Sequence, residues 1–322
     1  MIGCTHPSVR PIGRWFRIEE KIVATAAGSR FHLAFRGKMV VLHFLTTFMS
    51  SPHPHLWIRV DGGAAVEVPV DEKLRICVEN DGNHIVEVIH KSVIEMAHRW
   101  YQPLDGRVEF LGYEADAPGE LPPLSKKTIE FVGDSITEGV LIDHPTGDDL
   151  NWWQRPFQDD VTATYAWNTA QLLGLEPVIM GYGAVGVTRG GCGAVPKVQE
   201  AYPYCFNGAP ISYSNCDYIV INHGTNDRST SFEVFRDGYF QLLDVVCAHN
   251  PNSRIFVLSP FCGAWATELD TIVREYSEAR GRLIEYICSA GWIDPERIHP
   301  GRDGHICVAE NLARELRARG VK

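Results

Sequence analysis

The second part of the chain alternates short apolar segments with longer segments of helical periodicity, and this alternation limits the fold most strongly. The segments predicted as strands are 128–132, 177–180, 217–222 and 254–259. The segments predicted as helices are 163–173, 231–249, 266–290 and about 303–319. Strands that are apolar throughout are buried on both faces, and strands separated by helices pair in parallel. We therefore predict a three-layer α/β domain around a parallel sheet of about five strands.

The first 120 residues have a different pattern, with short apolar or alternating runs and no long helical segment. The runs are 30–35, 39–45, 56–60, 65–70, 84–89 and 108–113. Turn residues such as Asp61-Gly62-Gly63 separate them. Closely spaced strands of this kind predict an antiparallel β-sandwich. Because a proline-rich connector follows at 117–124, we predict two domains, a sandwich over 1–120 and the α/β domain over 126–322.

Charge and composition narrow the possible partners. The 322 residues include 30 basic and 40 acidic side chains, which gives a formal net charge of −10. A net acidic chain without a lysine or arginine block does not attract phosphate backbones, so we expect no nucleic-acid partner. No apolar run approaches the roughly 20 residues that span a bilayer, so we expect no membrane partner. The sequence leaves the oligomeric state open.

The cysteines and the N-terminal residues bear on the cellular location of the protein. Nine cysteines are spread over the chain without a CxxC pair, which argues against a zinc site and a thiol redox motif. The first 15 residues contain no apolar stretch typical of an export signal. These features predict reduced cysteines and a cytoplasmic protein, although a trimmed export signal would leave the same sequence.

Polar and glycine-rich clusters follow three of the predicted strands, and a fourth precedes the last predicted helix. The clusters are Gly133-Asp-Ser-Ile-Thr137, Gly181-Tyr-Gly-Ala-Val-Gly186, His223-Gly-Thr-Asn-Asp227 and His299-Pro300. Ligands of parallel α/β sheets bind at the carboxyl ends of the strands. We therefore expect these clusters to meet at one site.

The residue types in these clusters suit nucleophilic acyl transfer. Ser135 is the candidate nucleophile, at a tight turn that opens into a helix. His299 is the candidate base, because a neutral imidazole can take up and return a proton near pH 7. The tetrahedral oxyanion needs fixed donors, and the N–H groups of Ser135 and Gly183 and the side-chain amide of Asn226 suit that role. We expect neither a metal nor an organic cofactor.

The four clusters resemble the conserved blocks of the SGNH, or GDSL-type, hydrolase superfamily. The resemblance covers about 126–322 and includes GDSIT at 133–137 and GTND at 224–227. It implies that Ser135 is the nucleophile, that Ser135, Gly183 and Asn226 form the oxyanion hole, and that His299 is the base. We expect a flavodoxin-like strand order for this domain.

The sandwich ahead of the α/β domain narrows the resemblance. This arrangement, with Trp57-Ile-Arg-Val-Asp-Gly-Gly63 in the first part, resembles carbohydrate esterase family two. Members of that family join a jelly-roll-like sandwich to an SGNH domain and remove acetyl groups from sugars. The resemblance implies a serine acetylesterase whose partner is an acetylated carbohydrate or another small ester.

The third member of the catalytic group departs from the superfamily pattern. Glu296 occupies the place, three residues before the histidine, where the superfamily usually has aspartate. Glu296, Asp294 or a backbone carbonyl could orient His299, and the sequence does not decide among them. His305 competes with His299 because Asp303 lies two residues away, but the His-Pro pair favours His299.

Several other residues have a structural and a functional interpretation. Trp152 and Trp153 lie in the unpatterned segment 141–160 and are either core aromatics or a sugar-stacking, substrate-binding platform. Cys192 is interpreted as a loop cysteine, and Asp134 and Asp227 as braces of their turns. Two other functions stay open: an SGNH lipase or thioesterase for longer acyl chains, and an inactive carbohydrate-binding protein.

Overall fold

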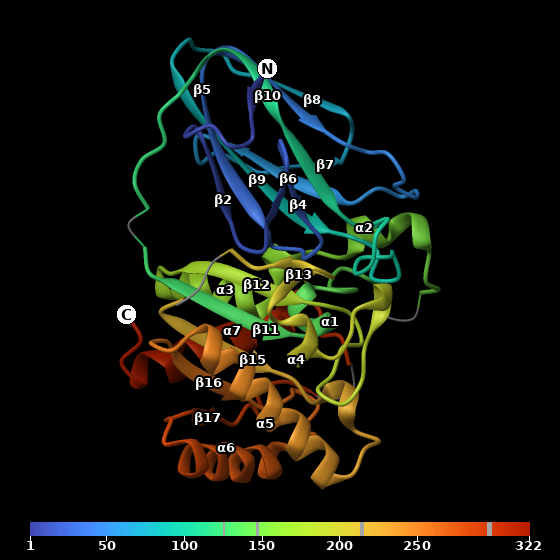
Figure 1. Ribbon diagram of the computed structural model, residues 1–322, viewed down its shortest axis with the longest axis vertical. Coiled ribbons are helices and arrows are strands. Elements are labelled where there is room, and N and C mark those ends of the chain that lie inside the picture. Colours follow the sequence, from blue (N-terminus) through green and yellow to red (C-terminus); the bar gives the residue numbers. More distant parts are fainter. Residues whose placement is uncertain (125, 146–147, 213–215, 295–297) are drawn as a thin grey trace.

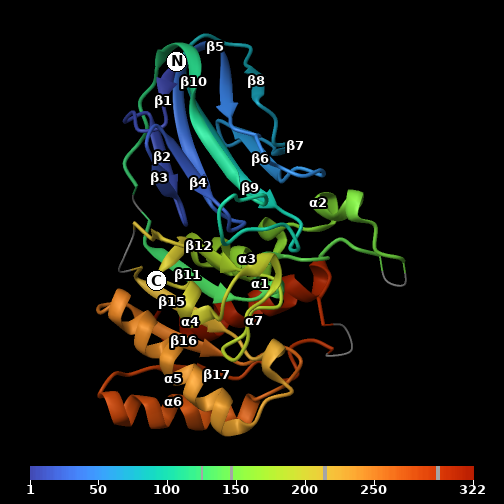
Figure 2. The same cartoon turned by 45° about the vertical axis from the view of Figure 1, so that its right-hand side comes forward.

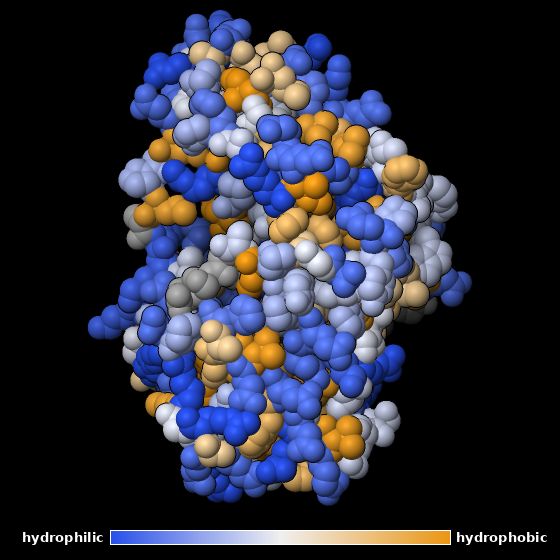
Figure 3. Space-filling view, viewed as in Figure 1, coloured by the Kyte–Doolittle hydropathy of each residue, from blue (hydrophilic) through white to orange (hydrophobic). Residues whose placement is uncertain are grey.

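The computed structural model describes residues 1–124, 126–145, 148–212, 216–294 and 298–322, arranged in two halves, one above the other in Figure 1. The upper half consists of strands between residues 2 and 118, and the lower half of strands and helices between residues 128 and 318. Figure 2 shows the same division from a second direction, with the extended segment after β10 running from the upper to the lower half. Hydrophobic residues are scattered among polar ones over the face shown in Figure 3.

The upper half is the predicted antiparallel sandwich. Its strands, counted over the described residues, are β1 (Ile2–Gly3), β2 (Val9–Ile12), β3 (Phe16–Ile18), β4 (Lys21–Ala24), β5 (Arg30–Phe44), β6 (His55–Val60), β7 (Val66–Pro69), β8 (Lys73–Cys77), β9 (Asn83–Ser92) and β10 (Val108–Pro118). Their main order is β3-β4-β10-β5-β9-β6-β7, with β1 on β10 and with β2 and β8 on β5. Buried side chains such as Phe31, Leu42 and Phe110 form its core.

The long strand β5 corrects one expectation. The sequence predicts two strands separated at Gly37-Lys38, whereas β5 continues from Arg30 to Phe44. Gly37 has a φ of +113°, which a side chain would disfavour, and its N–H donates to Gly82 O. The glycine therefore bends the strand instead of ending it. The first part of β5 pairs with β9 and its second part pairs with β8.

The lower half contains a parallel sheet in the predicted flavodoxin-like order. Within the described residues its strands are β11 (Thr128–Gly133), β12 (Glu176–Gly181), β15 (Tyr218–Asn222), β16 (Arg254–Leu258) and β17 (Glu285–Ile287). They are ordered β12-β11-β15-β16-β17, and all neighbours are parallel. Strand β17 is a correction, because the sequence predicts helix as far as residue 290. Helix α6 (Ala266–Arg280) ends where Gly281 adopts a left-handed φ of +61°, and the chain then returns to the sheet.

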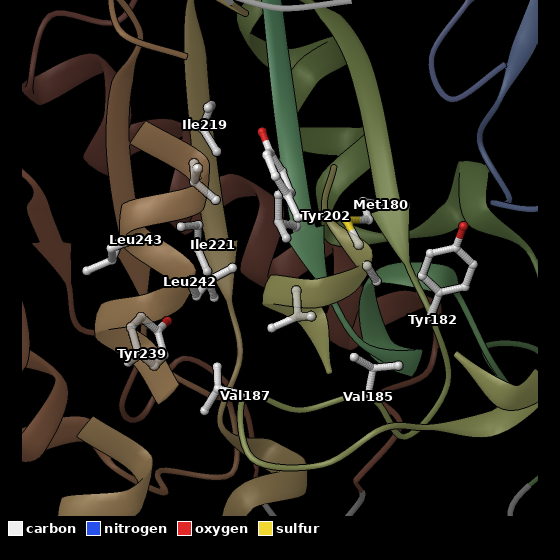
Figure 4. Close-up of a cluster of buried hydrophobic side chains, with 14 of the residues drawn as sticks. Met180, Tyr182, Val185, Val187, Tyr202, Ile219, Ile221, Tyr239, Leu242 and Leu243 are labelled. Atoms are coloured by element: carbon white, nitrogen blue, oxygen red, sulfur yellow. The ribbon is translucent and has the colours of Figure 1, made fainter. Parts of the chain in front are cut away.

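Helices cover both faces of this sheet. Side chains of α3 (Tyr165–Leu173) and α7 (Arg302–Ala318) share one core cluster, with Val220 and Phe256 of the sheet. Those of α4 (Val198–Ala201), α5 (Phe232–His249) and α6 share the other. Figure 4 shows the second layer, where Ile221 of β15 lies near Leu242 of α5. The remaining short elements are α1 (Ser135–Glu138), α2 (Arg155–Gln158), η1 (Trp152–Gln154), η2 (Val161–Ala163), η3 (Cys192–Ala194), η4 (Thr225–Asp227), β13 (Tyr204–Phe206) and β14 (Ala209–Pro210). None of the described helices is long and apolar enough to cross a bilayer.

The sandwich packs on β12, the edge strand of the parallel sheet. A Cβ atom added at Gly28 would lie 2.8 Å from Ile179 Cβ, so the two backbones approach closely here. Arg30 of the sandwich donates to Pro177 O over 2.8 Å and bonds to Glu176. Arg14 and Glu130 form an ion pair of 3.3 Å in which both side chains are 0% exposed. The halves are thus joined by buried polar contacts as well as by apolar packing.

Candidate active site

Ser135 lies at the carboxyl end of β11, as the first residue of α1. The turn before it is tight, because a Cβ atom at Gly133 would collide with Thr137 Oγ1. Asp134 caps α1, and its Oδ1 accepts from Ile136 N over 3.0 Å. Ser135 is buried, and its Oγ lies 2.9 Å from His299 Nε2. A hydroxyl within hydrogen-bond distance of an imidazole nitrogen can pass its proton to that nitrogen.

The two candidate histidines have different surroundings. His299 precedes α7 and contacts Ser135. His305 lies inside α7, is 1% exposed, and accepts through Nδ1 from Tyr165 N over 2.9 Å. His305 therefore fastens α7 to α3, and His299 is the histidine that meets the serine. Glu296 lies outside the described residues, so the group that orients His299 stays a prediction.

The loop after β12 brings Gly183 to the same end of the sheet. Gly183 O accepts from Cys192 N over 2.8 Å, and a Cβ atom at Gly191 would collide with Gly183 O. The two ends of the loop after β12, at Gly183 and at Gly191-Cys192, are therefore in contact. Within the described parts of the chain, the N–H groups of Ser135 and Gly183 have no hydrogen-bond acceptor. Free N–H groups of this kind can donate to a developing oxyanion.

Asn226, in η4, lies beside the serine turn through its side chain. Its Nδ2 donates to Val185 O over 3.0 Å and to Asp134 Oδ2 over 3.2 Å. These two bonds fix the amide next to Ser135 and use both of its hydrogens. An oxyanion held by Asn226 would therefore have to share or replace one of these acceptors.

Asp227 and Asp134 hold the turns around the serine, as expected from the sequence. Asp227 is 1% exposed and accepts from Val187 N over 3.2 Å and from Thr188 N over 2.8 Å. The pKa of Asp134 is raised to about 7, first because burial disfavours its charged form and further because of the charge of Asp227. The hydrogen bond from Ile136 N opposes this rise in pKa.

The sandwich contributes residues to one side of the site, and sequence analysis missed them. Glu95 follows β9, and its Oε2 lies so close to Gly183 that a Cβ atom there would collide with it. Glu95 Oε1 accepts from Arg155 Nη2 over 3.4 Å, and the same Arg155 nitrogen lies 3.1 Å from Asp159 Oδ2. Glu95 and Arg155 stand in no local motif, so nothing in the sequence marks them.

Arg99, further along the same sandwich segment, forms an ion pair with Glu138 of α1, and both side chains are almost wholly buried. Burial raises the pKa of Glu138 to about 7, and the charge of Arg99 opposes that rise. The charge of Glu95 adds to the rise in the Glu138 pKa. The helix that begins with Ser135 is therefore tied to the sandwich at its other end.

The structure also places the two tryptophans and the loop cysteine. Trp152 and Trp153 are 50% and 66% exposed, so they are not core residues. Trp152 lies against the Arg155 guanidinium and lines a hollow of about 310 Å³ together with sandwich residues including Pro54 and Met96. Burial raises the pKa of the Cys192 thiol, which is opposite to what a reactive thiol needs.

Comparisons with known proteins point in one direction. No known family model matches the chain. The chain is 28% identical over 234 residues to the cellulase/esterase CelE of Acetivibrio thermocellus, an alignment that covers 66% of this chain. That alignment spans only 28% of the length of CelE. The chain is also 24% identical over 297 residues to the acetylxylan esterase / glucomannan deacetylase of Cellvibrio japonicus, covering 85% of this chain and 79% of that protein.

A solved structure agrees with both halves of the chain. The family two carbohydrate esterase of Clostridium thermocellum, determined in complex with cellohexaose, superposes with a TM-score of 0.76. It covers 97% of this chain and 98% of its own, at 23% sequence identity, a level that bears on the fold. The predicted fold, a sandwich followed by a parallel α/β domain, is thereby confirmed. In sequence and in fold, the chain resembles the carbohydrate esterases of family two, as its four motif clusters and its sandwich predicted.

Proposed function

We propose that the protein is a serine esterase that hydrolyses small acyl esters, and that its substrates are O-acetyl groups on carbohydrates. The observation that carries the proposal is the 2.9 Å contact between Ser135 Oγ and His299 Nε2 at the carboxyl end of a parallel sheet. The acetyl and carbohydrate parts are supported by the similar proteins, of which one is named an acetylxylan esterase and glucomannan deacetylase.

The proposed reaction has two halves. His299 Nε2 takes the proton of Ser135 Oγ, which attacks the acetyl carbonyl carbon, and the resulting oxyanion accepts from the N–H groups of Ser135 and Gly183. His299 then gives its proton to the sugar oxygen as the ester bond breaks, which leaves an acetyl group on Ser135. In the second half His299 takes a proton from water, and the hydroxyl attacks the carbonyl carbon of the acetyl-enzyme. His299 then returns the proton to Ser135 Oγ as its bond to the acyl group breaks, and acetate leaves. Asn226 supports the oxyanion once one of its present acceptors gives way.

The exposed indoles of Trp152 and Trp153 are proposed to hold the sugar part of the substrate. A sugar ring stacks on an aromatic face through its C–H groups, and an indole that is half exposed offers such a face. The similar solved structure was determined in complex with cellohexaose, which supports a carbohydrate as the ligand. Replacing either tryptophan by alanine should raise KM for an acetylated oligosaccharide more than KM for p-nitrophenyl acetate.

A series of p-nitrophenyl esters tests the esterase proposal. Acetate, butyrate and octanoate are offered to the wild type, to Ser135→Ala and to Cys192→Ala, with circular dichroism as the check on folding. We expect the wild type and Cys192→Ala to prefer acetate and Ser135→Ala to be inactive. The cysteine variant is the matched control, because it removes a nucleophile of the neighbouring loop and leaves the serine in place.

Other outcomes would favour the alternatives. A preference for octanoate would indicate a lipase or thioesterase, because each buried CH₂ contributes about 0.8 kcal/mol where an acyl pocket exists. A folded wild type that hydrolyses none of the esters would indicate a carbohydrate-binding protein without catalytic activity.

We also propose that the protein is located in the reducing cytoplasm. All nine cysteines are described, and all are free thiols. Cell fractionation with an antibody against the chain tests this, and recovery with exported proteins would contradict it.

A further inference from the structure

Two arginines border a hollow beside Asn226. The hollow has a volume of about 370 Å³ and is lined by Arg189, Thr225, Asn226, Arg228 and Ser229. Both arginines are exposed. Arg228 Nε donates to Thr225 O over 2.9 Å and Arg189 Nε donates to Gly190 O over 3.4 Å, so each guanidinium is anchored to backbone. The ion pairs found among the residues that the structure describes include neither Arg189 nor Arg228.

The other arginines near the site differ in this respect. Arg155 is paired with Asp159 and Arg302 is paired with Asp143. Both of these arginines have an acidic partner within ion-pair distance, whereas Arg189 and Arg228 line the hollow with no such partner among the described residues. The chain as a whole has a formal net charge of −10, whereas these two side chains place positive charge beside the turn of the candidate catalytic serine.

The backbone that carries the two arginines is held in place. The buried carboxylate of Asp227, next to Arg228, accepts from Thr188 N and Thr188 Oγ1, next to Arg189. Gly186 N donates to Arg189 O over 3.0 Å, and a Cβ atom at Gly186 would lie 2.5 Å from Asp227 Oδ1. One buried carboxylate thus fastens the loop of Arg189 to the turn of Arg228. The two cations therefore face one hollow because of this clamp.

Two guanidinium groups beside one hollow suit a carboxylate. A guanidinium presents parallel N–H groups that match the two oxygens of a carboxylate. The acetyl group of the intact ester carries no charge, so a carboxylate in the bound substrate belongs to the alcohol part of the ester. We infer that the hollow is a carboxylate subsite, and that the preferred substrates are O-acetylated sugars of the uronic acid class. The inference rests on the proposed esterase function for its catalytic part only.

Matched sugars test the subsite. Acetate release is measured from O-acetylated methyl glucuronoside and from O-acetylated methyl glucoside, at low and at high salt. We expect kcat/KM of the wild type to be about tenfold higher for the acidic ester at low salt, since hydrogen bonds to charged groups are the stronger kind. High salt should reduce this ratio. In the double variant Arg189→Gln, Arg228→Gln the ratio should fall close to one.

A control and a second measurement separate this inference from the esterase proposal. Arg274→Gln removes an exposed arginine from α6 and should leave the ratio as in the wild type. Calorimetry compares binding of the unacetylated glucuronoside and glucoside, which requires no catalysis. Tighter binding of the glucuronoside by the wild type but not by the double variant supports the subsite even if p-nitrophenyl acetate is not hydrolysed. Equal binding of the two sugars by the wild type, or an unchanged difference in the double variant, would overturn it.

Discussion

The two walls of the candidate site are built in different ways. The wall from the parallel sheet consists of strand-end turns held by short-range hydrogen bonds, such as those accepted by Asp134 and Asp227. The wall from the sandwich consists of one segment after β9, held by ion pairs of Glu95 with Arg155 and of Arg99 with Glu138. The first wall supplies the proposed reacting groups, and the second fixes the helix and loop that carry them. Chemistry and its support therefore come from different halves of the chain.

The largest expected effect tests the sheet wall. Replacing His299 by alanine removes the proposed base from Ser135 Oγ, and kcat/KM for p-nitrophenyl acetate should fall about 10³-fold. His305→Ala is assayed beside it. This variant should lower the free energy of unfolding, because His305 Nδ1 accepts a hydrogen bond from Tyr165 N, and should leave the activity of the folded fraction close to that of the wild type. An active His299→Ala enzyme would contradict the assignment of the base.

The next effect tests the sandwich wall. Arg99→Met leaves the carboxylate of Glu138 buried without its partner, so the free energy of unfolding should fall by about 3 kcal/mol. Arg236→Met is the matched control, because Arg236 pairs with Glu275 on the surface and both side chains are more than a third exposed. Urea titration measures both. Equal losses in the two variants would show that the buried pair does not support the site.

A third variant tests the contact between the two walls. Gly183→Ala should lower kcat/KM about 10²-fold, because the added Cβ meets Glu95 and displaces the proposed oxyanion donor. Adding Glu95→Gly removes the obstructing side chain and should restore part of the activity. Gly82→Ala, in the sandwich, serves as the control because its Cβ would have only His84 Nε2, at 3.8 Å, nearby. If the double variant is no more active than Gly183→Ala, the walls are not coupled through this contact.

The smallest effect, taken per pH unit, concerns the pH dependence of stability. The folded pKa of Asp134 is about 7 against an ordinary value of 3.8, so the folded protein keeps a proton that the unfolded chain releases. The contribution of this carboxyl to stability is full below about pH 4 and is lost as pH rises towards 7. Asp134→Asn should therefore remove a downward slope in the free energy of unfolding over that range, at most about 1.4 kcal/mol per pH unit.

The control for the pH experiment has the opposite sign. The pKa of Asp244 lies below 3.8, mainly because Arg280 donates hydrogen bonds to it. Its contribution to stability is present above about pH 4 and is lost as pH falls further. Asp244→Asn should consequently change the slope only in that acid range. A slope between pH 4 and 7 that is identical in Asp134→Asn and in the wild type would contradict the raised pKa of Asp134.

What could be predicted from the sequence follows the same division between the two walls. Ser135, Gly183 and Asn226 stand in short clusters after apolar strands, and parallel strands bring such clusters to one edge whatever the rest of the chain does. Glu95 and Arg99 lie about 40 residues before the serine and reach it only through packing between the halves. No periodicity or spacing encodes that contact. The overextended helix at 266–290 failed for a local reason, since its apolar pattern continues past the stop at Gly281 into β17.

The covering of β12 by the sandwich has a consequence for how such proteins can be rearranged. Cutting the chain at the proline-rich connector would uncover an unpaired strand edge, and exposed strand edges promote association between molecules. It would also remove Arg14 from Glu130 and Arg99 from Glu138, so that both carboxylates would lose their ion-pair partners. The two halves are therefore not interchangeable modules. A fusion or a truncation that is meant to keep the activity should therefore include both the sandwich and the α/β half.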